Sequence, residues 1–134
     1  MSFFLSNNNL NSQQFNYKEI GEEFCKYYFN MVSYYDVNHL YHPQAFITFL
    51  EEEFIGVNAY NEKLLSIGSP KFVFNNLNGT IQPLGQNIII SINGDYNIYY
   101  NNILNNNWNK FTNTFILTQL NNNWIIINQI FKIM

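Results

Sequence analysis

The chain has 134 residues, which corresponds to one domain that is large enough to bury a sizeable apolar core. Charged residues make up only 11% of the sequence, and six Lys without any Arg leave a net charge of −3. Direct binding to nucleic acid is therefore not expected, because such binding draws its affinity from Lys and Arg against phosphates. The 26 Asn and 17 Ile are typical of AT-rich codon usage, so we do not read the Asn runs as functional signals.

Residues that hold metals, form disulfides or direct a chain to a membrane are scarce. One cysteine, Cys25, excludes an internal disulfide, and with only two His in the chain a Cys/His zinc site is excluded as well. No apolar run approaches the roughly 20 residues that span a bilayer, and the first residues lack the positive charge and apolar length of a signal peptide. We therefore expect no metal, no cofactor and no membrane contact, and a location in the cytoplasm or the nucleus.

The chain begins with a polar stretch. Residues 1–15 are rich in Asn and Ser and are predicted to form a flexible tail, so the folded domain spans residues 16–134. Asn16 followed by Glu19 matches a helix N-cap with a capping box. Apolar residues then recur every three or four positions and predict an amphipathic helix of about 18 residues. A further short helical turn is expected over residues 36–41, closed by the proline that follows.

A strand pair and a second helix come next. Residues 45–50 are typical of a strand, residues 51–53 of a charged turn and residues 54–56 of a short return strand. The second helix is predicted for residues 57–67, because its apolar residues share one face and Gly68 ends it.

Four long segments rich in Ile, Phe, Thr and Tyr follow, and each predicts a strand. They are residues 72–84, 87–100, 110–120 and 124–134, with a polar loop at 101–109 and an Asn turn at 121–123. Two pairs inside them, Asn78-Gly79 and Asn93-Gly94, are either hairpin turns or bends. Turns would give six or more very short strands. We favour bends, which give an α+β fold with a strongly curved sheet of long strands around a helix.

Four stretches, taken in order, carry a family resemblance. They are residues 20–28 (IGEEFCKYY), Phe54-Ile55-Gly56 followed by Leu64 and Leu65, residues 111–117 with Thr114-Phe115, and residues 128–131 (NQIF). Together they resemble the nuclear transport factor 2 family over about residues 16–134. The resemblance implies a cone-shaped domain in which three helices pack in a strongly curved, mostly antiparallel sheet.

The resemblance implies three possible functions. Transport factors of this family carry the GDP-bound GTPase Ran and bind Phe-Gly nucleoporin repeats. The Ras-GAP SH3-domain-binding proteins of stress granules dimerise through the same domain and bind FxFG and FGDF peptides. Isomerase and dehydratase relatives place acids, bases and tyrosines inside the cone.

Two of these functions lack some of the residues they need. For Ran binding, the position of a family carboxylate after the first strand falls on Leu50, and the loop at 101–109 contains no acid. For catalysis, the predicted strands carry few titratable groups, and the other candidates lie near the first and the short helix. These catalytic candidates are Asp95, Lys110 and Lys132 on strands, and Tyr34, Tyr35, Asp36, His39 and His42 near the helices. The sequence therefore favours a non-enzymatic module for Phe-Gly peptides, acting as a transport or adaptor protein or as a competitor. A Ran-GDP carrier and an isomerase or dehydratase are the alternatives.

The resemblance also implies a peptide groove between the first helix, the short helix and the last strand. Its lining residues are Ile20, Phe24, Tyr27, Asn38, Leu40 and Phe131. A helix stripe is normally core, so this assignment competes with plain core packing.

Both faces of the last two segments are largely apolar, so both are expected to be covered. One cover is the protein's own helices, and the other is a second copy of the chain in a homodimer. The residues assigned to the dimer interface are Phe111, Asn113, Phe115, Trp124, Ile126 and Asn128.

Overall fold

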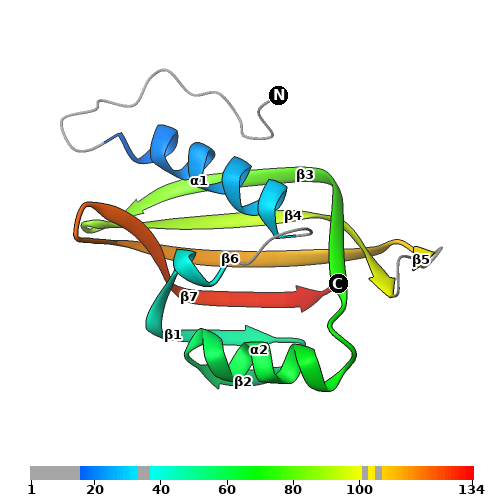
Figure 1. The fold of residues 1–134 in the computed structure, drawn as a ribbon. Coiled ribbons are helices and arrows are strands. Elements are labelled where there is room, and N and C mark those ends of the chain that lie inside the picture. Colours follow the sequence, from blue (N-terminus) through cyan, green and yellow to red (C-terminus); the bar gives the residue numbers. More distant parts are fainter. Residues whose placement is uncertain (1–15, 33–36, 101–102, 105–106) are drawn as a thin grey trace.

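The computed structural model describes residues 16–32, 37–100, 103–104 and 107–134, so the predicted tail lies outside the described residues. The described chain forms two α-helices, one short 3-10 helix and seven strands (Figure 1). They are α1 (Tyr17–Met31), η1 (Asn38–Leu40), β1 (Tyr41–Phe49), β2 (Glu52–Ile55), α2 (Val57–Ser66), β3 (Lys71–Leu84), β4 (Asn87–Tyr100), β5 (Ile103–Leu104), β6 (Asn109–Leu120) and β7 (Asn123–Ile133). The three expected helices are thus two α-helices and one 3-10 turn, and no described helix is long and apolar enough to cross a membrane.

The strands form one sheet in the order β2-β1-β7-β6-β4-β3, and β5 pairs with β4. Every pairing is antiparallel except that of β1 with β7. The helix α1 lies against β3 and β4, while α2 packs on β1 and β2 at the other end of the sheet (Figure 1). The predicted α+β fold with a mostly antiparallel sheet is confirmed.

The first helix begins with the predicted capping box. The Asn16 side chain accepts a hydrogen bond from the Glu19 backbone N–H at 3.3 Å and donates one to Glu19 Oε2 at 2.8 Å. The buried stripe of α1 includes Gly21, where a Cβ atom would lie 2.9 Å from Ile81 Cδ1. The missing side chain therefore lets α1 approach β3 closely.

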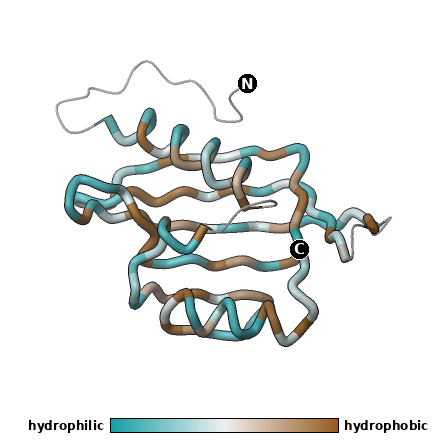
Figure 2. The backbone as a smooth tube through the Cα atoms, in the orientation of Figure 1, coloured by the Kyte–Doolittle hydropathy of each residue, from teal (hydrophilic) through white to brown (hydrophobic). Residues whose placement is uncertain are grey.

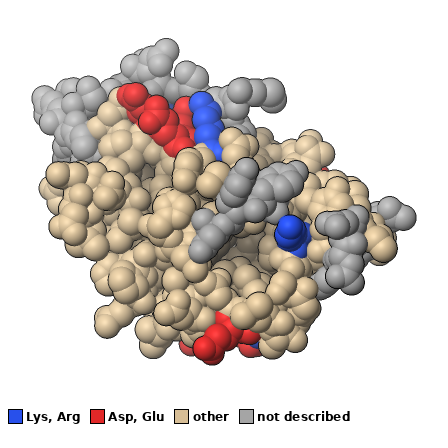
Figure 3. All heavy atoms as spheres, in the orientation of Figure 1, with Lys and Arg blue, Asp and Glu red and all other residues tan. Residues whose placement is uncertain are grey.

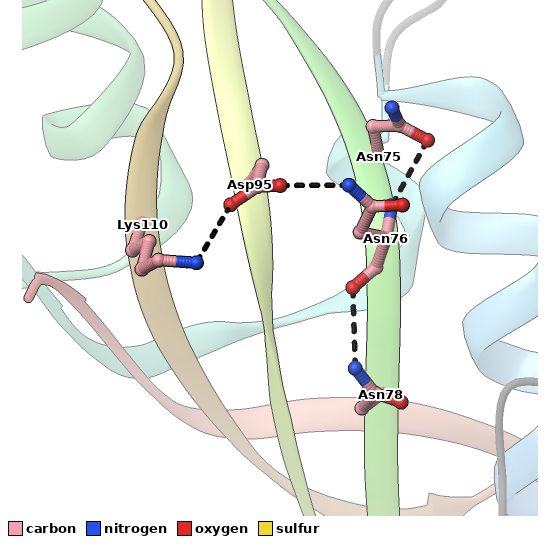
Figure 4. Close-up of polar contacts among 5 residues, drawn as sticks. All are labelled: Asn75, Asn76, Asn78, Asp95 and Lys110. Atoms are coloured by element: carbon pink, nitrogen blue, oxygen red, sulfur yellow. Dashed lines mark hydrogen bonds and ion pairs between the residues drawn. The ribbon is translucent and has the colours of Figure 1, made fainter.

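The two Asn-Gly pairs lie inside β3 and β4, which confirms bends rather than turns. The β3–β4 register shifts between Asn75 and Asn78, so β3 bulges there. Asn76 Nδ2 donates to Asp95 Oδ2 at 2.8 Å, and Lys110 Nζ lies 3.6 Å from Asp95 Oδ1, which connects the bulge to β4 and β6 (Figure 4). A Cβ on Gly94 would lie 2.9 Å from the Asn75 carbonyl oxygen, so the bulge fits only against glycine.

The core fills the hollow between the sheet and the helices with aromatic and branched side chains. Hydrophobic residues recur along the long strands and α1 (Figure 2). Phe111, Phe115 and Leu117 of β6 are fully buried, and they alternate with partly exposed threonines and Ile116. The face of the sheet that bears these buried residues is the core face, and the opposite one is the outer face.

Candidate functional site

A chain of hydrogen-bonded polar side chains crosses the interior of the cone. The Tyr28 hydroxyl of α1 lies 3.1 Å from the Tyr41 hydroxyl of β1, which donates to Gln129 Oε1 of β7. Gln129 Nε2 donates to Asn113 Oδ1 of β6 at 2.9 Å, whereas Asn113 Nδ2 has no hydrogen-bond partner among the described residues. This hydrogen-bond network thus connects α1, β1, β7 and β6 inside an otherwise apolar core.

The titratable groups in this interior keep their protons. Burial raises the pKa of the Tyr28 and Tyr41 hydroxyls above that of an exposed tyrosine. Burial, together with the nearby Glu22 carboxylate, also raises the pKa of the Cys25 thiol. None of these groups is poised to exchange a proton near neutral pH, as acid-base catalysis requires.

The other catalytic candidates are not gathered in the interior by the described structure. Tyr34, Tyr35 and Asp36 lie outside the described residues. His39 is exposed, and His42 Nδ1 accepts a hydrogen bond from the backbone N–H of Gln44 at 3.0 Å. Among the residues that the structure describes, no group of three or more His, Cys, Asp and Glu could hold a metal ion.

Two elements of the predicted peptide groove, α1 and η1, meet at Tyr27 and His39. The Tyr27 hydroxyl lies 3.2 Å from His39 Nε2, and the two rings meet edge to face with centroids 5.9 Å apart. Tyr27 is 44% exposed, and Ile20 lies two turns earlier on the same side of α1. Asn38 Oδ1 accepts a hydrogen bond from Asn61 Nδ2 of α2 at 2.7 Å. Ile20, Tyr27 and Asn38 are therefore the accessible members of the predicted set.

The other three predicted groove residues are core residues. Phe24 and Leu40 are only 8% and 9% exposed, and Phe131 only 5%. Phe131 also lies away from η1, because β7 pairs with β1 from Ile126 beside Tyr41 to Phe131 beside Phe49, a run of roughly 16 Å. Its ring stacks on Phe111 at 5.3 Å, whereas Phe24 packs on Phe115. Phe131 is therefore not part of a groove with α1 and η1.

Most of the residues predicted for the dimer interface lie in the core instead. Phe111, Asn113, Phe115 and Ile126 are at most 1% exposed, so they leave no surface for a partner. Since neither face of β6 is strongly polar, the sequence did not reveal which one meets the helices.

In β7 a bulge changes the alternation of side chains between the core face and the outer face. Leu117 pairs with Ile126 but Ile116 pairs with Asn128, so one extra residue of β7 turns Ile126 toward the core. Trp124 is half-buried and packs against the core, and Asn128 is on the outer face. Asn128 alone of the six therefore keeps its predicted outward position.

Two rows of paired side chains run across the outer face of the sheet. The strand registers define the first row as Ile55, Phe46, Asn128, Ile116, Ile89 and Gln82, and the second as Glu53, Thr48, Ile130, Thr114, Ser91 and Thr80. We call these twelve residues the outer rows. Phe46, Ile55 and Ile130 are 41%, 67% and 44% exposed, and Glu53 at the sheet edge is the one charged residue of the outer rows. Sequence reasoning missed Phe46 and Ile55, although Phe46 alternates with the buried Ala45 and Ile47.

Charges are sparse on the molecule. In the view that shows both helices, acidic side chains and a Lys gather over α1, more acidic side chains lie at the opposite end of the molecule, and much of the surface between them is uncharged (Figure 3).

A curved sheet with helices in its hollow and an interior filled by aromatic rings define a cone-shaped α+β domain. A family model of the nuclear transport factor 2 (NTF2) domain matches residues 20–133, so the chain belongs to the NTF2 domain family. No curated protein matches the chain at a significant level.

Several solved structures are similar to the chain. Nuclear transport factor 2 from Cryptosporidium parvum is 25% identical, with 94% of this chain and 98% of that chain covered and a TM-score of 0.76. The yeast UBP3-associated protein BRE5 is 18% identical, with 87% and 95% covered and a TM-score of 0.63. A putative scytalone dehydratase from Novosphingobium aromaticivorans is 12% identical, with 87% and 83% covered and a TM-score of 0.66. The last two likenesses show the fold alone.

Proposed function

We infer that the chain is a non-enzymatic, homodimeric binding module that recognises Phe-Gly segments of the FxFG nucleoporin or FGDF type. It acts as a transport or adaptor protein, or as a competitor for such segments, in the cytoplasm or nucleus. One observation carries this proposal: aromatic and aliphatic side chains fill the described interior, whereas Phe46, Ile55 and Ile130 remain exposed on the outer face, where Glu53 is the one charged residue of the outer rows. This distribution supports a role in binding proteins over acid-base catalysis in the interior.

The second copy in the proposed dimer covers the outer rows. Phe46 and Ile55 face each other across β1 and β2, and Ile130 lies in the neighbouring row. Two copies related by a twofold axis would bury these side chains against their counterparts. Asn128 and the threonines beside them supply hydrogen-bonding groups without a charge to desolvate.

Phe-Gly segments would bind where α1 meets η1, with Ile20, Tyr27 and Asn38 as the accessible contacts. Burial of one Phe side chain contributes about 1.5–3 kcal/mol, so two per motif contribute about 3–6 kcal/mol before ordering costs. A single site is therefore weak, with a dissociation constant of roughly tens of micromolar or poorer. A dimer that engages repeated segments gains from effective concentration.

Fluorescence polarisation with labelled FxFG and FGDF peptides tests the proposal. The matched variants are Tyr27→Ala and Trp108→Ala, because both side chains are 44% exposed and only Tyr27 belongs to the proposed site. We expect the wild type and Trp108→Ala to bind alike, and Tyr27→Ala to bind several-fold more weakly. Absence of wild-type binding at high micromolar protein would refute the proposed function.

Carriage of Ran-GDP is the first alternative, because a nuclear transport factor 2 is 25% identical to this chain. A pull-down with purified Ran-GDP, Ran-GTP and a Phe-Gly nucleoporin fragment separates the two proposals. Capture of Ran-GDP alone would favour the carrier.

An isomerase or dehydratase is the second alternative. The unpartnered Asn113 Nδ2 and the Tyr28–Tyr41 hydroxyl pair favour it, since such donors could hold a carbonyl oxygen. It lacks a described interior base that titrates near neutral pH, so the binding module is the better supported proposal.

A further inference from the structure

The two edges of the sheet are built differently. The strand order ends with β2 on one side and with β3 on the other. The β2 edge has only 4 residues and carries two exposed glutamates, whereas the β3 edge has 14 residues and a single charged residue, Lys71, at its first position. Short length and charged side chains are two of the features that keep an edge strand from pairing with a strand of another molecule. The β3 edge lacks both of these protections.

The composition of β3 makes it a good template for another strand. Its first part, Phe72-Val73-Phe74, consists of aromatic and branched residues with high strand propensity and no charge. Strands in globular proteins usually have about 5–6 residues, so an unbroken β3 would offer more than twice that length. Along its outer side, β3 has no strand partner among the described residues. A feature other than length or charge must therefore end the sheet at β3.

The bulge interrupts this edge close to its middle. Between Asn75 and Asn78, β3 has two residues where β4 has only Gly94. The first of the two, Asn76, has a φ of 54°, which lies in the left-handed region and not in the range of a strand. Near the end of the edge, Pro83 supplies no backbone N–H donor. The bulge and the proline thus divide the edge into short pieces.

Neighbouring side chains bind the backbone groups of the bulge (Figure 4). The Asn76 N–H donates to Asn75 Oδ1 at 2.9 Å, and the Asn76 carbonyl oxygen accepts a hydrogen bond from Asn78 Nδ2 at 3.3 Å. The Asn76 side chain donates to Asp95 Oδ2 at 2.8 Å, and Asp95 Oδ1 lies 3.6 Å from Lys110 Nζ. The N–H of Asn76 is therefore not available to an incoming strand, and its carbonyl oxygen is already bound.

We propose that this bulge protects the β3 edge: it prevents the sheet from joining edge to edge with the sheet of a second copy. The inference concerns the edge of the sheet and not the outer rows, and it does not depend on Phe-Gly binding. It also assigns a role to Asn75, Asn76 and Asn78 that composition alone did not reveal. Absence of peptide binding would refute the proposed function and leave this inference intact.

Deletion of Asn76 is the most direct test. The shortened β3 would pair regularly with β4, because Leu77 would then lie opposite Gly94 with the register unchanged on both sides. We expect sedimentation velocity to show species larger than those of the wild type that grow with protein concentration, and thioflavin T fluorescence to rise with them. The control is Gly85→Ala, which perturbs the turn of the same β3–β4 hairpin and leaves the bulge intact. It should sediment as the wild type does.

A second variant keeps the length of β3 and serves if the deletion variant does not fold. Asn75→Ala with Asn78→Ala removes the two side chains that bind the Asn76 backbone. The matched control is Asn30→Ala with Asn58→Ala, because these two asparagines are exposed on α1 and α2. We expect the first pair to form larger species than the control pair, though fewer than the deletion variant forms.

Three results would overturn the inference. The first is a deletion variant that is folded by circular dichroism and keeps the wild-type sedimentation, or, if it is unfolded, an Asn75 and Asn78 double variant that behaves like its control. The second is equal assembly in Gly85→Ala, which would assign the larger species to lost stability. The third is the loss of these species when Ile130→Glu is added to the deletion, which would assign them to the outer rows.

Discussion

Ile130→Glu is the most direct test of the outer rows as a dimer interface. Ile130 is 44% exposed in the single chain, and full burial of such a side chain contributes about 1.5–3 kcal/mol. Association would therefore recover about 1 kcal/mol per copy, and the substitution loses this twice because a twofold axis repeats it. Two carboxylates forced into the same apolar contact add a further cost of at least about 1 kcal/mol. The total of about 3 kcal/mol corresponds to a dissociation constant raised about a hundredfold.

Sedimentation velocity across a range of protein concentrations measures this change. The matched control is Leu65→Glu, because Leu65 is 69% exposed on α2 and does not belong to the outer rows. We expect the wild type and Leu65→Glu to sediment as dimers, and Ile130→Glu to sediment as a monomer with an unchanged circular dichroism spectrum. A wild type that stays monomeric at every concentration would refute the reasoning, as would a dimer that tolerates Ile130→Glu.

Three further predictions concern the sheet and the interior. Gly94→Ala should lower the free energy of unfolding by about 1–3 kcal/mol in urea titrations, because the new Cβ would lie 2.9 Å from the Asn75 carbonyl oxygen. The control is Gly85→Ala, whose new Cβ meets no atom within 4 Å. It should lower the free energy of unfolding by roughly 1 kcal/mol, from the strain of a φ of 61° alone. Gln129→Leu should lower the free energy of unfolding by about 2–5 kcal/mol, because it removes hydrogen-bond partners from the buried Tyr41 and Asn113 side chains. The double variant Gln129→Leu with Asn113→Leu should lose less stability than the two single variants added together. An additive result would contradict the interior hydrogen-bond network. The free energy of unfolding should fall above about pH 10, because tyrosines of the unfolded chain ionise there while the raised pKa values keep Tyr28 and Tyr41 protonated in the fold. Tyr28→Phe should make this fall with pH less steep, as measured by urea titrations at alkaline pH.

Most of the fold could be predicted from local patterns. The capping residues Asn16 and Glu19 marked the start of α1, and runs of Ile, Phe and Thr marked β3, β4, β6 and β7 to within about one residue at most ends. The start of β1 was missed because it contains Pro43 and an irregular register before Phe46. These features depend on neighbours in sequence, which is why the sequence reveals them.

The candidate sites could be predicted less well, because they depend on which way a strand faces. A strand with one strongly polar face reveals its orientation, whereas neither face of β6 or β7 is strongly polar. The bulge in β7 then reverses the alternation near Ile126, and no local residue pattern marks it. The error for Phe131 has a different origin: its distance from η1 follows from the parallel pairing of β1 with β7, a contact between segments about 80 residues apart.

The apolar residues on both faces of the sheet, which hide the orientation of its strands, also support the proposal of a second copy. A sheet needs one apolar face to fold against its own helices, and a second apolar face adds nothing to the stability of the single chain while it stays in water. Yet Phe46, Ile55, Ile116 and Ile130 lie together on that second face, and Glu53 is the one charged residue of the outer rows. Only 11% of the residues are charged, so little in this chain opposes association through the face. Introducing one charge there should therefore separate the copies without unfolding them, whereas a charge placed at Phe115 on the core face should unfold the chain.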